Sequence, residues 1–524
     1  MLRWIRDRLF RRPVHAPGTE EGVEAWIRQG RASHEAGDFA AAEGYYRQVL
    51  DEQPDQADAL YRLGEIEALR QNNEHAAGLI RRAISIDGAK AQFHFALGCV
   101  QQASGERSEA ADCYRRALAL DQSHLAAHLN LGYLLQTGAE AHLATAGAGR
   151  AAAQRGFEEA LSHFRAATEI APEGTDGWIN LGYALERQRE LADARRCYDR
   201  ALALDPHLIE ARFNRSLLLL AQGDYPEGWK DYEWRWQASG YPRPAFSQGE
   251  WDGRPLNGET VLLYTEQGFG DAIQFVRYAA AVAARGGRAM VSCQTELLRL
   301  LQTVPGVSGT LTPGQAVEFD LHCSLLSLPR VLGTTIDTIP AQVPYILPDA
   351  ALVSEWRARL RDEPSGVKVG LVWASHSMMP NAALKSTTLS VFAPLREVGG
   401  VRFYSLQTGA SGRQATTAGP LPLIDHTARI SDFSDTAALI ANLDLIIAVD
   451  TAVAHLAGAM DKPVWTMLRH APDWRWYPDA RQSKWYPSMR LYRQRIRGDW
   501  AGVCDEIAKD LREFVAGLGA ISRT

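Results

Sequence analysis

A spacing of 34 residues constrains the first half of this chain more than any other feature. The glycines that mark it are Gly30, Gly64, Gly98 and Gly132, and the series resumes with Gly182 and Ser216. Most of these positions are followed twelve residues later by a small residue and sixteen residues later by a bulky one, as in Ala42 and Tyr46. Self-similarity at a fixed period of this size predicts a repeat architecture.

Each repeat has the pattern of a helix pair whose small residues allow close approach. One pair cannot bury its apolar face alone, so neighbouring pairs stack into a superhelix with a concave groove. The pattern resembles the tetratricopeptide repeat and predicts about six copies over residues 23–236. The resemblance implies a protein or peptide partner in the groove, with a passive spacer or a self-association surface as the alternative.

The fourth repeat departs from the period, because Ala160 follows Gly132 by 28 positions instead of 12. The surplus, near residues 138–155, is rich in alanine and glycine and predicts either lengthened helices or a flexible loop. After the last repeat, residues 237–259 combine aromatic residues with prolines. That composition is typical of a packed junction, so we expect the two halves of the chain to dock rigidly.

Composition excludes several classes of protein. A net charge of −6 argues against a general nucleic-acid binder, and six scattered cysteines fit reduced thiols in a cytoplasmic protein better than disulfides or a zinc site. No run of 18 apolar residues predicts a membrane span. Residues 1–22 form a basic N-terminal segment, and its part Met1–Arg12 lacks the apolar core of a signal peptide. We expect a solvated terminus, with a weak peripheral membrane contact as the alternative.

From Thr260 onward, short apolar strands alternate with helices, which predicts parallel sheet. The expected strands are Val261–Thr265, Arg288–Cys293 and Phe319–Cys323, then Lys368–Trp373, Val401–Leu406, Leu443–Val449 and Lys462–Leu468. The proline-rich passage Ile339–Pro348 reads as a crossover between two doubly wound lobes, residues 260–345 and 346–524, the latter closed by a helix over Asp499–Leu518. Such lobes bind ligands at the carboxyl ends of their strands, in a cleft.

The stretch Leu443–Met460 predicts a buried strand that turns directly into a helix of small residues. Asp450 and Thr451 fall at the turn, where free N–H groups and the helix dipole favour phosphate. His455 lies four residues after Thr451 and therefore on the same helix face. The alternative is structural: Asp450 as an N-cap, Thr451 as a helix starter and His455 as a hydrogen-bonded core histidine.

A second corner of this kind follows the first expected strand of the α/β half. Glu266-Gln267-Gly268-Phe-Gly270-Asp271 lacks the spacing of a dinucleotide fingerprint, but its glycines allow a tight turn. We expect Asp271 at the edge of the first lobe, where a carboxylate can act as a general base for an acceptor hydroxyl. A helix-capping role for Asp271 is the alternative.

These two corners resemble the heptosyltransferase-type glycosyltransferases of family nine, and the whole chain resembles bacterial tetratricopeptide-repeat proteins that carry such a domain. The resemblance implies a two-lobed GT-B fold with inverting, single-displacement transfer from a nucleotide sugar, without a metal or other cofactor. Asp271 matches the catalytic base and Asp450 the acid that contacts the donor's sugar. Donor and phosphate binding would involve Gly268, Gly270, Lys385, Asp450, Thr451, the N–H of Ala452, and His455, with Gln267 as a further candidate.

The loop after the expected strand Lys368–Trp373 departs from related proteins, which have an Asn- and Arg-rich loop there. In this chain, only His376, Asn381 and Lys385 remain there as polar candidates for donor binding. Lys385 could equally be a solvated surface lysine. The segments Pro472–Pro478 and Trp485–Arg490 are dense in aromatic residues and arginine. They predict either a lining that stacks on a base or sugar, with Arg475 on phosphate, or packing at a domain junction.

The sequence therefore predicts a cytoplasmic glycosyltransferase in which an N-terminal α-solenoid selects the acceptor for a C-terminal two-lobed α/β domain. A protein acceptor is the natural inference, because the arrangement also resembles the protein O-linked N-acetylglucosamine transferases in outline; a glycan acceptor is the alternative. The rival function is a non-catalytic adaptor whose α/β half has kept its fold and lost turnover. The altered loop at 374–383 favours this rival.

Overall fold

The structure, a computed structural model, describes residues 20–144, 149–238, 240, 242–375, 382–416 and 419–521. Two compact units make up the chain. One contains the residues up to Thr137 together with Gly156–Asn180, and the other contains Gly138–Arg155 and everything from Leu181 onward. Among the described helices, none has the length and apolar character needed to cross a membrane.

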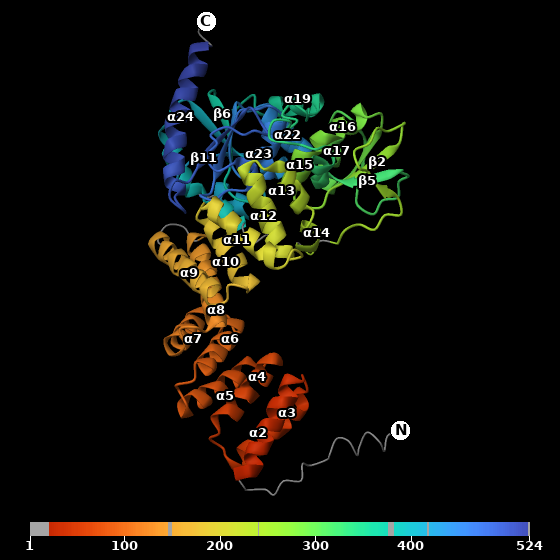
Figure 1. Cartoon of the computed structure of the whole chain (residues 1–524). Coiled ribbons are helices and arrows are strands. Elements are labelled where there is room, and N and C mark those ends of the chain that lie inside the picture. Colours follow the sequence, from red (N-terminus) through yellow and green to blue (C-terminus); the bar gives the residue numbers. More distant parts are fainter. Residues whose placement is uncertain are drawn as a thin grey trace. The chain divides into compact units, whose positions relative to one another are not determined.

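Six consecutive helix pairs form the repeat array (Figure 1). They are α2 (Glu20–Glu35) with α3 (Phe39–Glu52), α4 (Ala57–Leu69) with α5 (Asn73–Ile86), α6 (Ala91–Ala103) with α7 (Arg107–Leu120), α8 (Leu125–Ala144) with α9 (Arg150–Ile170), α10 (Thr175–Arg187) with α11 (Leu191–Leu204), and α12 (Ile209–Gln222) with α13 (Tyr225–Tyr232). The short α14 (Arg235–Ala238) follows them. The expected repeat solenoid is thus confirmed.

The 34-residue period has a steric cause within each pair. A Cβ atom on Gly30 would lie 2.6 Å from the ring of Tyr46, and one on Gly98 would lie 2.6 Å from the ring of Tyr114. Gly132 lies in the same way against Phe164 in the fourth pair. Any side chain at these glycines would push the two helices apart, so the small and bulky positions are matched across each pair.

The surplus of the fourth repeat forms lengthened helices, the first of the two expected alternatives. Helix α8 has 20 residues and α9 has 21, whereas the helices of the third and fifth pairs have 13 or 14. The alanine-rich composition of the surplus explains this outcome, because alanine has the highest helix propensity. Residues 145–148, between the two helices, lie outside the described residues.

The first lobe of the α/β half contains a parallel sheet in the order β1-β5-β2-β3-β4. Its strands are β1 (Gly249–Glu250), β2 (Thr260–Tyr264), β3 (Arg288–Ser292), β4 (Val307–Leu311) and β5 (Leu321–Ser324). All five side chains of β2 are buried. Its helices are α15 (Phe269–Phe275), α16 (Ala279–Ala284), α17 (Leu298–Leu301) and α18 (Leu328–Val331). Figure 1 shows α16 and α17 beside this sheet.

The second lobe contains a parallel sheet in the order β11-β10-β9-β6-β7-β8. Its strands are β6 (Val367–Val372), β7 (Val401–Ser405), β8 (Ile424–Asp425), β9 (Leu445–Val449), β10 (Val464–Leu468) and β11 (Met489–Arg493). The chain starts in the middle, runs to one edge, and then returns to fill the other side. The strand order therefore reverses between β6 and β9, and ligands of doubly wound sheets bind at such a point.

Helices connect and cover this second sheet. They are α19 (Ala350–Arg359), α20 (Ala382–Lys385), α21 (Gly409–Gly412), α22 (Phe433–Ala441), α23 (Ala452–Ala459) and α24 (Trp500–Ile521), and a 3₁₀ segment, Leu389–Glu397, occupies the place of the helix expected near 391–398. Pro394 inside that segment explains the difference, because proline removes an N–H that an α-helix needs. Figure 1 shows α24 along β11. The expected two-lobed α/β arrangement is confirmed.

The last repeat packs tightly into the α/β half. Tyr225 and Trp229 of α13 share a buried aromatic cluster with Trp474 and Trp485, in which the rings of Trp229 and Trp474 lie 5.2 Å apart. Arg235 is fully buried and donates two hydrogen bonds, of 3.0 and 2.8 Å, to the carboxylate of Glu266 just after β2. The end of the array is thus continuous with the core of the first lobe.

Candidate active site

The second-lobe corner lies at the point where the strand order reverses. Asp450 and Thr451 follow β9, and α23 begins at Ala452 with Thr451 as its N-cap. The hydroxyl of Thr451 is buried and has no hydrogen-bond partner within the described ranges. In the first turn, the N–H of Ala454 donates to the carbonyl of Thr451 at 3.0 Å. The N–H groups of Ala452 and Val453 precede it at the helix start, where N–H groups have no partner inside the helix. The corner therefore offers donors to an anion, as the sequence predicts.

Lys385 is held at this corner by the returning loop after β6. The hydroxyl of Ser386 accepts a hydrogen bond of 2.9 Å from the N–H of Ser375, and Thr387 donates one of 2.8 Å to the carbonyl of Trp373. The ammonium Nζ of Lys385 consequently lies 3.0 Å from a carboxylate oxygen of Asp450, and the lysine side chain is 27% exposed. It is not the freely solvated surface lysine of the alternative interpretation.

The first-lobe corner places Asp271 in the first turn of α15. One of its carboxylate oxygens accepts a 3.2 Å hydrogen bond from the N–H of Gly268, the N-cap residue. The expected capping role is therefore present, and the side chain still keeps 23% of its surface exposed. The carbonyl of Gln267 accepts a 2.9 Å bond from the side chain of Gln294, which fixes the turn before the helix.

The two corners touch each other across the lobes. A Cβ atom on Gly270 would lie 3.0 Å from Cδ2 of His455 and 3.6 Å from Cα of Ala452. Helix α15 of the first lobe therefore packs directly on α23 of the second. The structure thus brings together Gly268, Gly270, Asp271, Lys385, Asp450, Thr451, Ala452 and His455.

Arg475 joins the first corner to the second lobe. Its guanidinium donates to the carboxylate of Asp271, to Asp473 at 2.8 Å and to the amide oxygen of Gln274 at 2.6 Å. Its flat face lies 4.4 Å from the ring of Trp474. Arg475 is thus fully engaged by protein groups, and its expected contact with phosphate stays a prediction.

His455 is buried and neutral in this environment. Its Nδ1 lies 2.9 Å from the hydroxyl of Tyr486, its ring lies against Trp476, and its Nε2 is 4.0 Å from Asp450. Burial lowers the pKa of His455 to about 3, although Asp450 opposes the shift. Burial keeps Tyr486 protonated, so we assign its O–H as the donor to Nδ1, which leaves Nε2 as an N–H donor.

The carboxylates of the site have different pKa values. Burial raises the pKa of Asp271, although Arg475 opposes the shift. Burial also acts on Asp473, but Arg475 and Lys385 outweigh it and lower its pKa to about 2. Burial works against the charged form of Lys385, whereas Asp450 and Asp473 raise its pKa above the usual range. A carboxylate with a raised pKa beside fixed charges is typical of a general base.

Comparison with known proteins divides the chain in the same way. Models described as "Tetratricopeptide repeat" match residues 22–91, 91–124 and 175–208, and a model described as "Glycosyltransferase family 9 (heptosyltransferase)" matches residues 430–490. The chain pairs tetratricopeptide repeats with a family-nine glycosyltransferase-type region. This is the combination that the sequence analysis expects. The family-nine match includes Asp450, His455, Asp473 and Arg475 but neither Asp271 nor Lys385.

Among curated relatives, Protein FlbA of Caulobacter vibrioides is 28% identical over 398 residues, which are 69% of this chain and 64% of FlbA. The Caenorhabditis elegans tetratricopeptide repeat-containing protein trd-1 is 34% identical over 74 residues, or 14% of this chain and 10% of that protein. Solved structures similar to the repeats include MamA (TM-score 0.29, 20% identity, 36% of this chain, 94% of MamA) and Pseudomonas aeruginosa pilF (0.36, 17%, 43%, 94%).

Some expected site residues occupy other places. His376 and Asn381 lie outside the described residues, as does Met1–Arg12. The aromatic side chains Trp476, Trp485 and Tyr486 are fully buried. Of the two interpretations of the aromatic segments, packing at a junction is therefore the one that the structure shows, and stacking on a base or sugar is wrong for these three rings.

Sequence reasoning missed Asp473, Gln274 and Arg469. Gln274 lies one helical turn after Asp271 on α15, so helical spacing alone could have paired them. Asp473 stands two residues before Arg475, where it also accepts the N–H of that residue in a tight turn. Arg469 directly follows β10, and its position at a strand's carboxyl end was the available signal.

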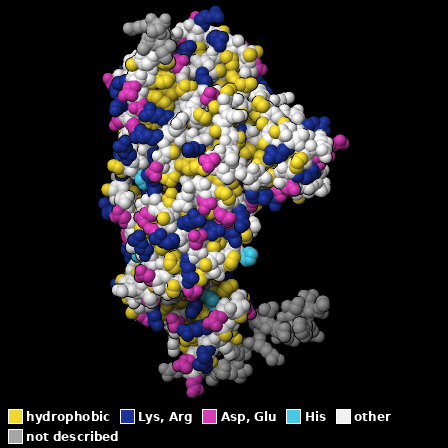
Figure 2. Space-filling model, turned by 45° about the horizontal axis from the view of Figure 1, so that its top comes forward, with side chains coloured by type: hydrophobic (Ala, Val, Ile, Leu, Met, Phe, Trp, Pro, Cys, Tyr) yellow, Lys and Arg dark blue, Asp and Glu magenta, His cyan; other side chains and the backbone are white. Residues whose placement is uncertain are grey.

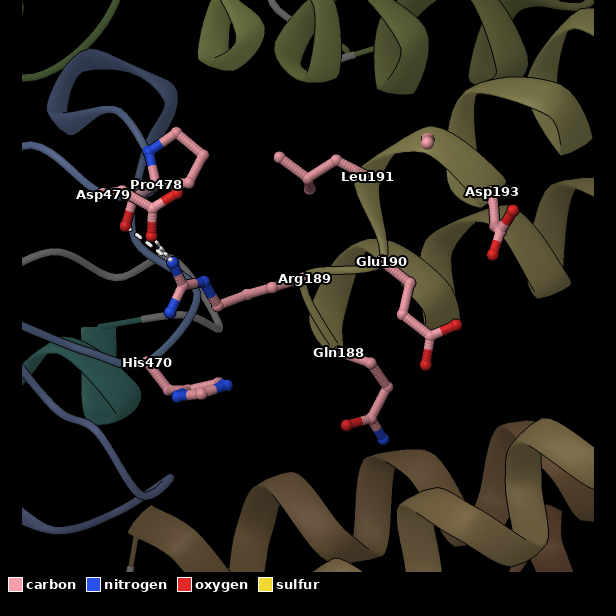
Figure 3. Close-up of a pocket in the computed structure, with 9 residues that line it drawn as sticks. Gln188, Arg189, Glu190, Leu191, Asp193, His470, Pro478 and Asp479 are labelled. Carbon is pink, nitrogen blue, oxygen red and sulfur yellow. Dashed lines mark hydrogen bonds and ion pairs between the residues drawn. The ribbon is translucent and has the colours of Figure 1, made fainter.

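A hollow of about 560 Å³ lies apart from these residues (Figure 3). Its lining comes from the α10–α11 turn and from loops of the family-nine region, including Arg189, His470 and Asp479. Arg189 reaches across to Asp479 in Figure 3 and forms an ion pair of 2.6 Å with it. On the face in Figure 2, acidic and basic side chains are intermixed.

Proposed function

We propose that this protein transfers a sugar from a nucleotide-sugar donor to an acceptor chosen by the repeat array. The observation that carries the proposal is the contact of Gly270 with His455 and Ala452. It brings a partly exposed carboxylate with a raised pKa, Asp271, to a helix start that is rich in anion donors. These are the two functions that a single displacement needs, namely a base for the acceptor and a support for the leaving group.

In the proposed reaction, Asp271 removes the proton of an acceptor hydroxyl while the hydroxyl oxygen attacks the anomeric carbon of the donor. The new C–O bond forms as the bond from that carbon to the diphosphate breaks, and the configuration inverts. The nucleoside diphosphate leaves with its added charge offset by Lys385 and by the first N–H groups of α23. No metal is required in this scheme, because these groups already provide positive charge at the leaving oxygen.

His455 and Asp450 then have distinct roles. The neutral ring of His455 donates a hydrogen bond from Nε2 to a phosphate oxygen. Asp450, which pairs with Lys385, exchanges part of that interaction for a hydroxyl of the donor sugar. Both roles follow the sequence resemblance and are supported by the location of the two residues at the start of α23.

The partner of the array is proposed to be a protein or peptide that enters its groove and presents the acceptor hydroxyl. The site and the last repeat share one buried core, so a groove-bound chain could be delivered to Asp271 directly. We place the reaction in the cytoplasm, where nucleotide sugars are made. The basic residues 1–12 add a weak membrane contact in this proposal.

One observation favours the second function, a non-catalytic adaptor. Asp271 is engaged by Arg475, and Lys385 by Asp450, so the proposed base and the proposed phosphate-binding lysine each have a charged partner in this structure. An adaptor could keep these ion pairs permanently. An enzyme has to replace the Asp271–Arg475 ion pair with a contact between Asp271 and the acceptor when the acceptor binds.

Ligand-dependent unfolding separates the two functions. Wild-type protein is titrated with nucleoside diphosphates and nucleotide sugars, and the unfolding temperature is followed together with that of His455→Ala and Lys385→Ala. The enzyme predicts a concentration-dependent rise that both variants lose, whereas Lys484→Ala, at an exposed lysine, keeps it. No rise with any nucleotide would favour the adaptor.

A further inference from the structure

Arg469 is the first residue after β10, and the sheet register determines which residue lies beside it. Met467 of β10 pairs with Val449 of β9. Arg469 leaves β10 two positions after Met467, and Thr451 leaves β9 two positions after Val449, so both residues follow the ends of neighbouring strands at the same edge of the sheet. An arginine therefore lies at the carboxyl end of the strand that neighbours the anion-binding corner.

The guanidinium of Arg469 lacks the partners that buried arginines normally have. Its Nε and Nη1 are buried and have no hydrogen-bond partner in the described part of the chain. The hydroxyl oxygen of Thr451 is also buried and without a hydrogen-bond partner in that part of the chain. By contrast, Arg475 and Arg235 in the same half bind two carboxylates each. Buried polar groups are almost always satisfied, so unsatisfied donors on two residues at the same edge of one sheet indicate a missing acceptor.

The charges around Arg469 agree with this interpretation. Burial lowers its pKa to about 10, and Arg187 at the end of repeat helix α10 lowers it as well, while Asp473 and Asp450 act in the opposite direction. The charge of Arg469 also acts to lower the pKa of Lys385, so Arg469, Arg187 and Lys385 lie in one region. Arg187 is 3.5 Å from Glu140, but Arg469 has no comparable counter-ion among the described residues. Cations gathered in a buried region favour a multiply charged anion.

We propose that Arg469 binds a phosphate group of the donor's diphosphate together with Thr451, and that the positive charge of Arg187 in the fifth repeat supports this binding. Arginine suits this task, because its fork of N–H groups matches two phosphate oxygens. The identity of the ligand as a nucleotide rests on the proposed function, whereas the anion site itself does not. The repeat array then takes part in donor binding and not only in acceptor choice.

The test is a binding titration of the full chain with inorganic pyrophosphate, and separately with nucleoside diphosphates and monophosphates. Arg469→Gln is expected to weaken pyrophosphate and diphosphate binding at least tenfold, and Arg469→Lys to keep part of the affinity. Arg187→Gln is expected to have a smaller effect in the same direction. The control is Arg495→Gln, because the side chain of Arg495 is 79% exposed and its nearest carboxylate is 3.9 Å away.

Unfolding without ligand distinguishes a binding arginine from a structural one. Removing a charge that has no counter-ion should leave the unfolding temperature of Arg469→Gln unchanged or raise it. A lower temperature in both Arg469→Gln and Arg469→Lys would assign the residue a structural role and overturn the proposal. Unchanged affinity for pyrophosphate in a folded Arg469→Gln variant would also overturn it.

Failure of the proposed function would look different. If wild-type protein binds pyrophosphate through Arg469 but does not bind any nucleotide, the anion site is supported and the proposed glycosyl transfer is contradicted. If nucleotides bind equally to wild type and to Arg469→Gln, the donor site is supported and the proposed role of Arg469 is contradicted. A variant that keeps both affinities and loses only turnover would assign Arg469 to the acceptor, against this proposal. A wild type that binds neither ligand would contradict both.

Discussion

Gly270 of the first lobe lies so close to His455 of the second that a single added carbon would come within 3.0 Å of the imidazole ring. Gly270 has an ordinary backbone conformation, so it is required for space and not for a positive φ. The Gly-Phe-Gly-Asp turn therefore serves lobe contact as much as turn formation. The sequence predicts a tight turn with close backbone approach here, and the structure shows that Gly270 makes its close approach to His455.

Gly270→Ala should disturb this contact while its neighbour tolerates the same change. The added methyl overpacks the interface, for which costs of about 1–3 kcal/mol are usual. Gly268→Ala is the matched control, because its Cβ would meet only a carboxylate oxygen of Asp271 at 3.7 Å. Urea unfolding and nucleotide titration of both variants check this. Equal behaviour of the two would show that the lobes are not in contact at Gly270.

Asp271→Asn should abolish transfer without loss of donor binding. General bases contribute about 10²–10⁴-fold to rates, and the amide keeps the size of the side chain but cannot accept the proton. Transfer of a labelled sugar at saturating donor measures the loss, and nucleotide titration measures binding. Glu296→Gln serves as a control at an exposed acid of the same lobe. Full turnover in Asp271→Asn would remove the base from the proposed mechanism.

His455 should make the protein less stable as the pH falls below neutral. Its pKa is about 3 in the folded state and about 6.5 in an unfolded chain, so only the unfolded state takes up the proton between these values. The contribution is fully present above pH 6.5 and decreases by up to about 1.4 kcal/mol per pH unit below it.

The measurement is urea unfolding of wild type, His455→Gln and His207→Gln between pH 7.5 and 4.5. His455→Gln should show a flatter pH profile than wild type. His207 is exposed, so His207→Gln should follow wild type. Parallel profiles for wild type and His455→Gln would mean that the ring is not held neutral by burial.

Arg235→Ala should destabilise the α/β half strongly. It would leave Glu266 buried without its counter-ion, and breaking a buried pair in this way costs about 3–5 kcal/mol. A double variant, Arg235→Met with Glu266→Gln, removes both charges and should recover most of the loss. Urea unfolding followed by tryptophan fluorescence tests both. Equal stability of the single and double variants would contradict the pairing.

Long-period and strongly apolar features of the fold could be predicted from the sequence. The repeat period showed through because glycines and bulky residues face each other in every pair, and β9 was evident because all its side chains are buried. The two-residue strands β1 and β8 were missed, and so were the longer strands β4 and β11. Strand β4 is Val-Ser-Gly-Thr-Leu, with weak apolar character, and β11, Met-Arg-Leu-Tyr-Arg, has arginine at two of its five positions, so neither has the apolar run of a buried strand.

Only the site residues that belong to a local sequence motif could be predicted. Asp271 and Asp450 stand next to glycines or small residues at strand ends, which is a local signal. The partners of Arg475 come from different lobes, since Asp271 lies 204 positions away from it, and spacing cannot predict such a contact. The unpartnered atoms of the Arg469 guanidinium likewise depend on how β10 lies beside β9, which no local pattern contains.

The buried arginine at the end of the array also limits how such a protein can be rearranged. In the sheet order β1-β5-β2-β3-β4 the reversal falls between β5 and β2, and Arg235 contacts Glu266 and Ser324 just there. The tail of the solenoid thus occupies the place where a lone lobe of this kind would admit a small molecule. Grafting a foreign solenoid onto the α/β half would succeed only if the last turn of the original one were carried along.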